Sequence, residues 1–286
     1  MRPGTCHSLD IAYSPSSLVD DLEAELAALA ARSAAVLASS GPAVLRDLRY
    51  GDHPDQTLHL FPPPSSGAPL LVFLHGGYWI EGTKDASCYP APHVLRAGGG
   101  FAAAGYPLAP TASLETMVIQ CRQLLAWLYQ QAAEYGYDPD RIHLAGHSAG
   151  GHLAAMLLST PWAERYGIPD EVLAGLTIMS GIFDLEPITR TYVNEPLGLD
   201  RASALRNSPL FLEPVGHPPV LIAHGEYETP EFKRQSLAFA TTCRAWGLSC
   251  ELLEVTGRNH FDMAFELTDP ATPLGAGVLR QMGLSR

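Results

Sequence analysis

From residue 70 to residue 282, short apolar runs alternate with longer segments whose apolar residues recur at helical spacing. The apolar runs are Leu70–Leu74, Gly100–Ala104, Arg141–Ala145, Val172–Met179, Pro219–Ala223 and Ser249–Val255, and the helical segments are Ser113–Glu134, Ala149–Ser159, Pro230–Trp246 and Ala271–Met282. Strands that are apolar on both faces need cover on both faces, and the helices between them supply it. The alternation predicts an α/β fold with a mostly parallel central sheet and helices on both of its faces.

The first 64 residues follow a different pattern. Ser17–Ser39 has apolar residues at helical spacing and acidic residues early, where the helix dipole favours them, which predicts a surface helix. Val44–Tyr50 and Gln56–Phe61 alternate and are separated by a turn sequence, which predicts a β-hairpin. No linker divides the chain, so we expect one domain over residues 1–286, with the proline-rich stretch Gly181–His217 inserted as a partial lid.

Charge excludes several classes of partner. Thirty acidic against eighteen basic residues give a formal charge of −12, and no basic cluster interrupts this excess. Such a field repels nucleic-acid phosphates and anionic lipid, so we expect neither as a partner. Neither a secretory signal nor a membrane-spanning segment stands out. The sequence leaves the oligomeric state open, a homodimer being one alternative.

Cysteine usage indicates the compartment. The five cysteines are scattered and form no CxxC pair: Cys6, Cys88, Cys121, Cys243 and Cys250. An odd, dispersed set argues against a disulfide framework and suits a reducing, cytoplasmic setting. Metal-ligand spacing such as HExxH is missing from the sequence as well, so no metal or other cofactor is expected.

A glycine-flanked serine marks the chemistry. Gly146-His147-Ser148-Ala149-Gly150 lies between an expected strand and an expected helix, which is the context that the G-x-S-x-G motif requires. The glycines allow a sharp turn that exposes Ser148 above the sheet, and the helix that follows adds positive potential at its first residues. The pattern predicts that Ser148 is a nucleophile.

A second glycine pair predicts donors for a developing oxyanion. His75-Gly76-Gly77-Tyr78-Trp79 follows the strand Leu70–Leu74, so its backbone N–H groups are free to point at a ligand. Acyl transfer needs two such donors. We expect them to be Gly76 or Gly77 together with Ala149.

The serine needs a base, and His260 is the candidate. It follows the strand Ser249–Val255 in a loop, at the sheet edge where open α/β folds place their sites. The competing histidines lie elsewhere: His143 in a strand, His147 at the variable position of the serine motif, His152 on a helix and His75 in the glycine loop.

An acid should orient that base. Two glutamates follow the strand Pro219–Ala223, and we favour Glu228 over Glu226 because it stands further round the turn. Asp184, after the preceding strand, is the reserve candidate. The order Ser148…Glu228…His260 is the one expected of this arrangement.

With these segments placed, the chain resembles the α/β-hydrolase superfamily, and within it the kynurenine formamidase (arylformamidase) family. The resemblance runs from about Leu70 to Leu267 and includes the serine and glycine motifs, Gly151–Ala155, Ser180–Leu185, Glu228–Ser236 and Asn259–Asp262. The Glu228 and Asn259 segments are the more particular to formamidases, and they support Glu228 as the acid, although an aspartate stands there in some members. The resemblance implies the α/β-hydrolase fold and the hydrolysis of N-formylkynurenine through an acyl-serine.

The sequence identifies the substrate less closely than it identifies the catalytic residues. An aromatic leaving group needs flat apolar walls. Candidates are Tyr78, Trp79, Phe183, Tyr192 and Phe261. The sequence offers no distinct cation for a substrate carboxylate. The expected partner is therefore a small molecule, an aryl formamide by the main interpretation or a small acyl ester by the alternative of a carboxylesterase. A non-catalytic ligand-binding protein on the same scaffold is the alternative of another class.

Overall fold

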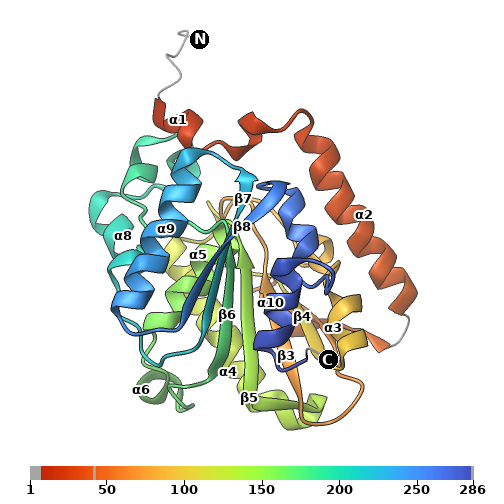
Figure 1. Cartoon of the computed structure of the whole chain (residues 1–286). Coiled ribbons are helices and arrows are strands. Elements are labelled where there is room, and N and C mark those ends of the chain that lie inside the picture. Colours follow the sequence, from red (N-terminus) through yellow and green to blue (C-terminus); the bar gives the residue numbers. More distant parts are fainter. Residues whose placement is uncertain (1–7, 41–42, 285–286) are drawn as a thin grey trace.

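A computed structural model describes residues 8–40 and 43–284, and its centre is one eight-stranded sheet (Figure 1). The strands are β1 Leu45–Arg49, β2 Thr57–Phe61, β3 Ala68–Leu74, β4 Gly100–Ala104, β5 Tyr137–His147, β6 Leu173–Met179, β7 Val220–Tyr227 and β8 Cys250–Asn259. Their order is β1-β2-β4-β3-β5-β6-β7-β8, antiparallel from β1 to β4 and parallel from there on. The predicted hairpin and the mostly parallel sheet are confirmed.

Helices cover both faces of the sheet (Figure 1). The helices of four or more residues are α1 Ser8–Ala12, η1 Pro15–Leu18, α2 Leu22–Ser40, α3 Ala91–Ala97, α4 Leu114–Tyr135, α5 Ala149–Met156, α6 Trp162–Tyr166, η5 Pro187–Arg190, α7 Asn194–Leu197, α8 Arg201–Arg206, α9 Pro230–Ala245, η7 Asp262–Glu266 and α10 Pro273–Gln281; η3 Asp85–Ser87, η4 Leu157–Ser159 and η6 Pro209–Phe211 are shorter. In β3, Leu70, Val72 and Leu74 face the core under α4, α5 and α9. The alternate residues Leu71 and Phe73 face the core under α2, α3 and α10.

Two elements differ from the sequence prediction. Helix α3 was not predicted, because Pro90 at its N-cap and Pro92 in its first turn resemble a loop sequence. Proline is tolerated there, since the first N–H groups of a helix lack helical partners. Helix α2 begins at Leu22 rather than Ser17, and the carboxylate of Asp21 accepts the N–H of Ala24 at 2.9 Å. The preceding residues form the separate turn η1.

The insertion at residues 181–217 folds as the short helices η5, α7, α8 and η6 beside α5 and α9 (Figure 1). It is joined to the start of the described chain. The N–H of Tyr192 donates to the carboxylate of Asp10 at 2.9 Å, and Ser14 donates to the hydroxyl of Tyr192 at 3.0 Å. Helix α1 and turn η1 therefore lie against this insertion.

Two further findings concern the described part of the chain. No helix in it is both long and apolar enough to cross a membrane. Cys88, Cys121, Cys243 and Cys250 are free thiols, whereas Cys6 lies outside the described residues.

Candidate active site

Ser148 occupies a strained turn between the last residue of β5 and the first residue of α5. Its φ of 55° is left-handed, which costs a non-glycine residue on the order of 1–3 kcal/mol. The glycines on either side are required by space, because a Cβ at Gly146 would lie 2.2 Å from the carbonyl oxygen of Gly150. A Cβ at Gly150 would lie 2.1 Å from the carbonyl oxygen of Leu74. The motif therefore builds the turn that the sequence predicts.

His260 and Glu228 form a buried pair at the carboxyl ends of β8 and β7. Nδ1 of His260 lies 3.1 Å from Oε2 of Glu228, and the two residues are 3% and 6% exposed. The other carboxylate oxygen of Glu228 accepts the N–H of Gly225 at 2.9 Å and the hydroxyl of Ser180. The carboxylate thus has three donors, each from a different strand end.

These contacts keep Glu228 ionised. Burial would raise the pKa of the Glu228 carboxyl, but the charge of His260 and the hydrogen bonds from His260, Ser180 and Gly225 outweigh it, so the pKa falls below its ordinary value. A carboxylate in this position selects the His260 tautomer with its proton on Nδ1, which leaves Nε2 free to accept a proton.

The two other candidate acids serve the loops instead. Oε2 of Glu226 accepts the N–H of Gly257 at 2.7 Å, which ties the end of β7 to the last residues of β8. Oδ1 of Asp184 accepts the N–H of Glu186 at 3.1 Å, within its own turn. Among the three, only Glu228 contacts His260.

His147 connects the serine turn to the base. Its Nε2 lies 2.7 Å from the carbonyl oxygen of His260, and the two ring centroids are 4.8 Å apart. No hydrogen bond joins the Ser148 hydroxyl to the His260 ring within residues 8–40 and 43–284; such bonds are commonly long in unliganded enzymes and tighten with substrate. The sequence marked His147 only as a variable position and missed this contact, which depends on residues 113 positions apart.

The glycine loop reaches the serine. A Cβ on Gly76 would lie 3.1 Å from Cβ of Ser148, so the loop backbone passes directly over that side chain. Gly77 has a φ of 112°, and its carbonyl oxygen accepts the N–H groups of Ile80 and Glu81 at 2.9 and 3.0 Å. The loop is thereby coiled, and the backbone of Gly76 lies beside Ser148 at the start of α5. The N–H of Ala149, as the first residue of that helix, has no hydrogen-bond partner within it.

A stacked pair supports this loop from below. The rings of His75 and Tyr106 are 4.3 Å apart at 14°, and the Tyr106 hydroxyl donates to the carbonyl oxygen of His75 at 2.7 Å. Burial lowers the pKa of His75 to about 4, so this histidine is neutral near pH 7. Its role is to support the loop.

Two of the five aromatic residues that we expected to line a substrate site do not do so. Trp79 and Phe183 are fully buried: the indole N–H donates to Nδ1 of His152 at 3.2 Å, and Phe183 stacks on Phe239 with centroids 4.1 Å apart. Neither has surface for a substrate to touch, so that prediction is wrong for both. The helices packed against them decide this, and the sequence does not show which helices those are.

The other three aromatic residues keep accessible surface. Phe261 places its ring 5.1 Å from that of His260, and Tyr78 is partly buried with its hydroxyl donating to the carbonyl oxygen of Tyr13. Tyr192 is exposed on the insertion. Phe261 is thus the one of the three whose ring directly contacts the candidate base.

The N-terminal segment contributes to the site, which the sequence did not indicate. Tyr13 is fully buried, and its hydroxyl donates to Oε1 of Glu231 at 2.6 Å while accepting from the amide of Gln235 at 2.9 Å. The Thr229 hydroxyl donates to the carbonyl oxygen of Ala12 at 2.6 Å. Residues 12 and 13 are therefore tied to the segment that follows Glu228.

The surface near His260 is acidic. A cavity of about 400 Å³ lies beside the loop of His260, and its lining is Leu18, Val19, Asp20, Asp21, Ala24, Glu25 and Asn259. The nearby arginines are already paired, Arg234 with Glu231 and Arg258 with Glu266. In the described residues, moreover, no group of three or more His, Cys, Asp or Glu side chains is placed to hold a metal ion.

The sequence of the chain is similar to those of known proteins. The BD-FAE family model matches residues 58–166, which include the glycine loop and the serine turn. Kynurenine formamidase of Danio rerio is 34% identical over 97% of this chain and 96% of its own length.

Solved structures share the fold. A candidate thioesterase from Silicibacter sp. TM1040 superimposes with a TM-score of 0.83 at 28% identity, covering 95% of this chain and 98% of its own. The carboxylesterase EstE1, cloned from a metagenomic library, superimposes with a TM-score of 0.68 at 20% identity over 96% and 99% of the two chains. The second likeness concerns the fold alone.

Proposed function

Because this chain belongs to the kynurenine formamidase family, we propose that it hydrolyses an aryl formamide such as N-formylkynurenine through Ser148, His260 and Glu228. The chain is a hydrolase with an α/β-hydrolase fold. The observation that carries the assignment of residues is the 3.1 Å contact between His260 and Glu228, since no other acid considered reaches that ring.

The first half of the reaction forms a formyl-serine. Oγ of Ser148 attacks the formyl carbon while Nε2 of His260 takes the hydroxyl proton. Glu228 stabilises the resulting imidazolium, and the N–H groups of Gly76 or Gly77 and Ala149 donate to the oxyanion. The C–N bond then breaks as His260 returns the proton to the aryl amine nitrogen.

The second half releases formate. His260 deprotonates a water molecule, which attacks the formyl-serine carbon, and the same amide donors hold the second oxyanion. Collapse regenerates Ser148 with the proton from His260. The acyl group has one carbon, so the reaction needs little acyl pocket, which suits a serine that is 4% exposed.

A carboxylesterase that acts on uncharged esters is the second candidate, and the acidic surroundings favour it. Asp20, Asp21 and Glu25 line the cavity beside Asn259, while Arg234 and Arg258 are held by glutamates. The carboxylate of N-formylkynurenine would find no unpaired cation among these residues. An uncharged aryl formamide or ester would not need one.

Steady-state kinetics separates the two candidates. The substrates to compare are N-formylkynurenine, p-nitrophenyl acetate and p-nitrophenyl butyrate, with the Ser148→Ala protein as the blank. The formamidase function predicts the highest kcat/KM for the formamide and the lowest for butyrate. A preference for butyrate by orders of magnitude would assign the carboxylesterase function instead.

The thiols support a proposal for the location of the protein. All four cysteines in the described part of the chain are free, which is consistent with a reducing compartment, and we propose the cytoplasm.

A further inference from the structure

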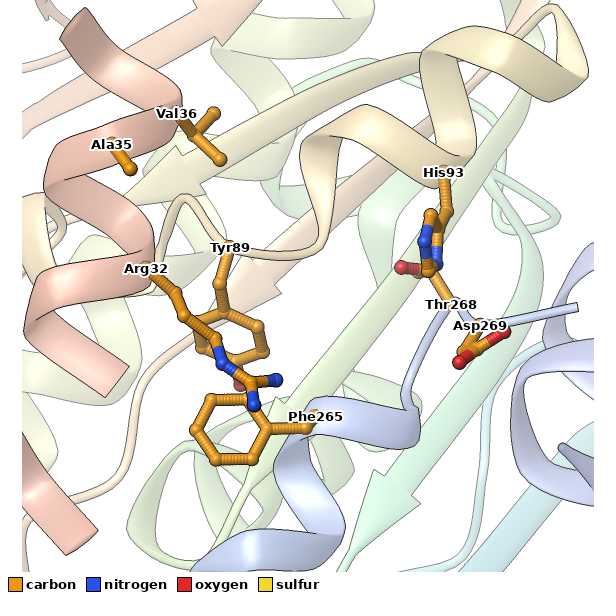
Figure 2. Close-up of a pocket in the computed structure, with 8 residues that line it drawn as sticks. All are labelled: Arg32, Ala35, Val36, Tyr89, His93, Phe265, Thr268 and Asp269. Atoms are coloured by element: carbon orange, nitrogen blue, oxygen red, sulfur yellow. The ribbon is translucent and has the colours of Figure 1, made fainter. Parts of the chain in front are cut away.

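A second pocket lies on the side of the sheet covered by α2 and α3, beside the segment that follows His260 (Figure 2). Its volume is about 320 Å³, and its lining is Arg32, Ala35, Val36, Tyr89, His93, Phe265, Thr268 and Asp269. This lining shares no residue with the candidate catalytic set or with the cavity beside Asn259. The proposed reaction uses none of these side chains.

Arg32 is the distinctive group in the pocket. Its guanidinium carbon lies 3.6 Å from the centroid of the Phe265 ring, a cation–π contact that occupies one face of the guanidinium and leaves its N–H edge available (Figure 2). Among the residues that the structure describes, Arg32 forms no ion pair. In a protein with a net charge of −12, an unpaired arginine in a pocket is suited to bind an anion.

The rest of the lining indicates what the anion is attached to. Tyr89 and Phe265 meet edge to face with centroids 5.7 Å apart, and Ala35 and Val36 of α2 add apolar wall. His93, Thr268 and Asp269 gather at the other end, away from Arg32 (Figure 2). Oδ1 of Asp269 accepts the N–H of Ala271 at 2.9 Å, and its second oxygen is available to a donor.

We propose that this pocket binds a one-ring aromatic carboxylate that carries a hydrogen-bond donor opposite its carboxylate. The carboxylate pairs with the guanidinium of Arg32, the ring packs between the aromatic residues and α2, and the donor reaches Asp269. The volume accommodates a molecule of that size and lies at the lower end of typical ligand pockets.

The pocket is connected to the catalytic loop through η7. Phe265 lies on η7, which begins two residues after His260. On the same turn, the sulfur of Met263 lies 3.0 Å from the hydroxyl of Ser180, which donates to Glu228. A ligand that packs on Phe265 therefore stabilises the turn that follows the base.

Calorimetric titration with 4-aminobenzoate tests the proposal. The protein is first treated with an organophosphonate that modifies an active serine, so that Ser148 is blocked. We expect saturable binding of one molecule per chain, weakened at least about tenfold by Arg32→Gln, which loses the charge-assisted pair. Arg201→Gln is the matched control, because Arg201 is also an exposed arginine but lies on α8, outside the pocket. This variant should bind 4-aminobenzoate as tightly as the protein without substitutions.

Ligand analogues check each end of the site. 4-Aminobenzamide lacks the charge and benzoate lacks the donor, so both should bind more weakly than 4-aminobenzoate. A ligand concentration of about 10 mM detects even weak sites. The proposal is overturned if 4-aminobenzoate does not bind at that concentration, or if Arg32→Gln binds it as well as the unsubstituted protein does. Failure of the phosphonate to attach to Ser148 would count against the proposed function and leave the Arg32 comparison intact.

Discussion

The imidazole of His147 holds the main chain of His260, with Nε2 of the first 2.7 Å from the carbonyl oxygen of the second. A carbonyl oxygen can only accept, so His147 has its proton on Nε2. Burial and the neighbouring charge of His260 lower the pKa of His147 to about 3, which keeps it neutral near pH 7. The residue next to Ser148 is thus a permanent donor to the loop that carries the base.

His147→Phe should lower kcat while KM changes little. Phenylalanine retains the ring packing but loses the donor, so the His260 loop shifts relative to Ser148, and a misplacement of about 1 Å can cost about 10²-fold in rate. We expect a loss of about 10–100-fold in kcat, measured by steady-state kinetics. His147→Gln keeps an N–H donor and should recover part of the loss; equal activity in both variants would contradict a positioning role.

Ser148→Ala should abolish turnover. Removing a serine nucleophile typically costs about 10⁶ in kcat, and the variant should also fail to form a covalent phosphonate adduct by mass spectrometry. Ser159→Ala, a serine just after α5, is the control and should stay active. Residual activity within tenfold of the unmodified protein would show that another residue is the nucleophile.

The two glutamates after β7 provide a matched pair. Glu228→Gln keeps the shape but removes the charge that stabilises the His260 imidazolium, so kcat should fall by about 10⁴, as in comparable triads. The carboxylate of Glu226 binds only the Gly257 N–H among the described residues, so Glu226→Gln should lower kcat by less than about tenfold. The opposite ranking in kinetic assays would transfer the role of the acid to Glu226.

Tyr13→Phe should destabilise the protein. The buried hydroxyl donates a hydrogen bond to Glu231 and accepts one from Gln235. Removing it leaves both groups without this partner, which lowers the free energy of unfolding by about 1–3 kcal/mol. Urea denaturation measures the change. Tyr192→Phe removes an exposed hydroxyl that accepts a hydrogen bond from Ser14, and it should cost less than about 0.5 kcal/mol. Similar losses in both variants would contradict the role assigned to Tyr13.

Buried histidines should make the fold sensitive to acid. Burial lowers the pKa of His75, His143 and His152 to about 4 and that of His147 to about 3, from an ordinary value of 6.5. Below pH 6.5 the unfolded chain therefore binds up to about four more protons than the folded chain, so stability falls as pH falls.

The melting temperature should accordingly drop between pH 6.5 and pH 4, because the folded chain keeps these four histidines neutral over most of that range. Scanning calorimetry over this range measures it. His152→Gln should make the dependence shallower by about one proton, while His53→Gln, a partly exposed histidine, should not. A melting temperature that stays constant from pH 7 to pH 4 would contradict this account.

Local sequence predicts a structural element when all the residues that the element requires lie in one short segment. The strands and most helices were predictable because burial on both faces and helical spacing are properties of consecutive residues. The turn at Ser148 was predictable because the G-x-S-x-G motif itself contains the glycines that the turn needs. A Cβ at Gly146 would meet the carbonyl oxygen of Gly150 inside the motif, although the close contact of Gly150 is with the carbonyl oxygen of Leu74 on β3. The proline-containing start of α3 was not predictable, because the same residues are compatible with a loop.

The sequence by itself determined the class of fold, the serine turn and the order in which serine, acid and base occur along the chain. Only the tertiary structure decided which partner each side chain meets: Trp79 and Phe183 are covered by packed helices, Glu228 rather than Glu226 faces His260, and Tyr13 is tied to the start of α9. The reason is physical. Backbone conformation depends mainly on neighbours along the chain, whereas burial and pairing depend on segments brought together only when the sheet and helices pack.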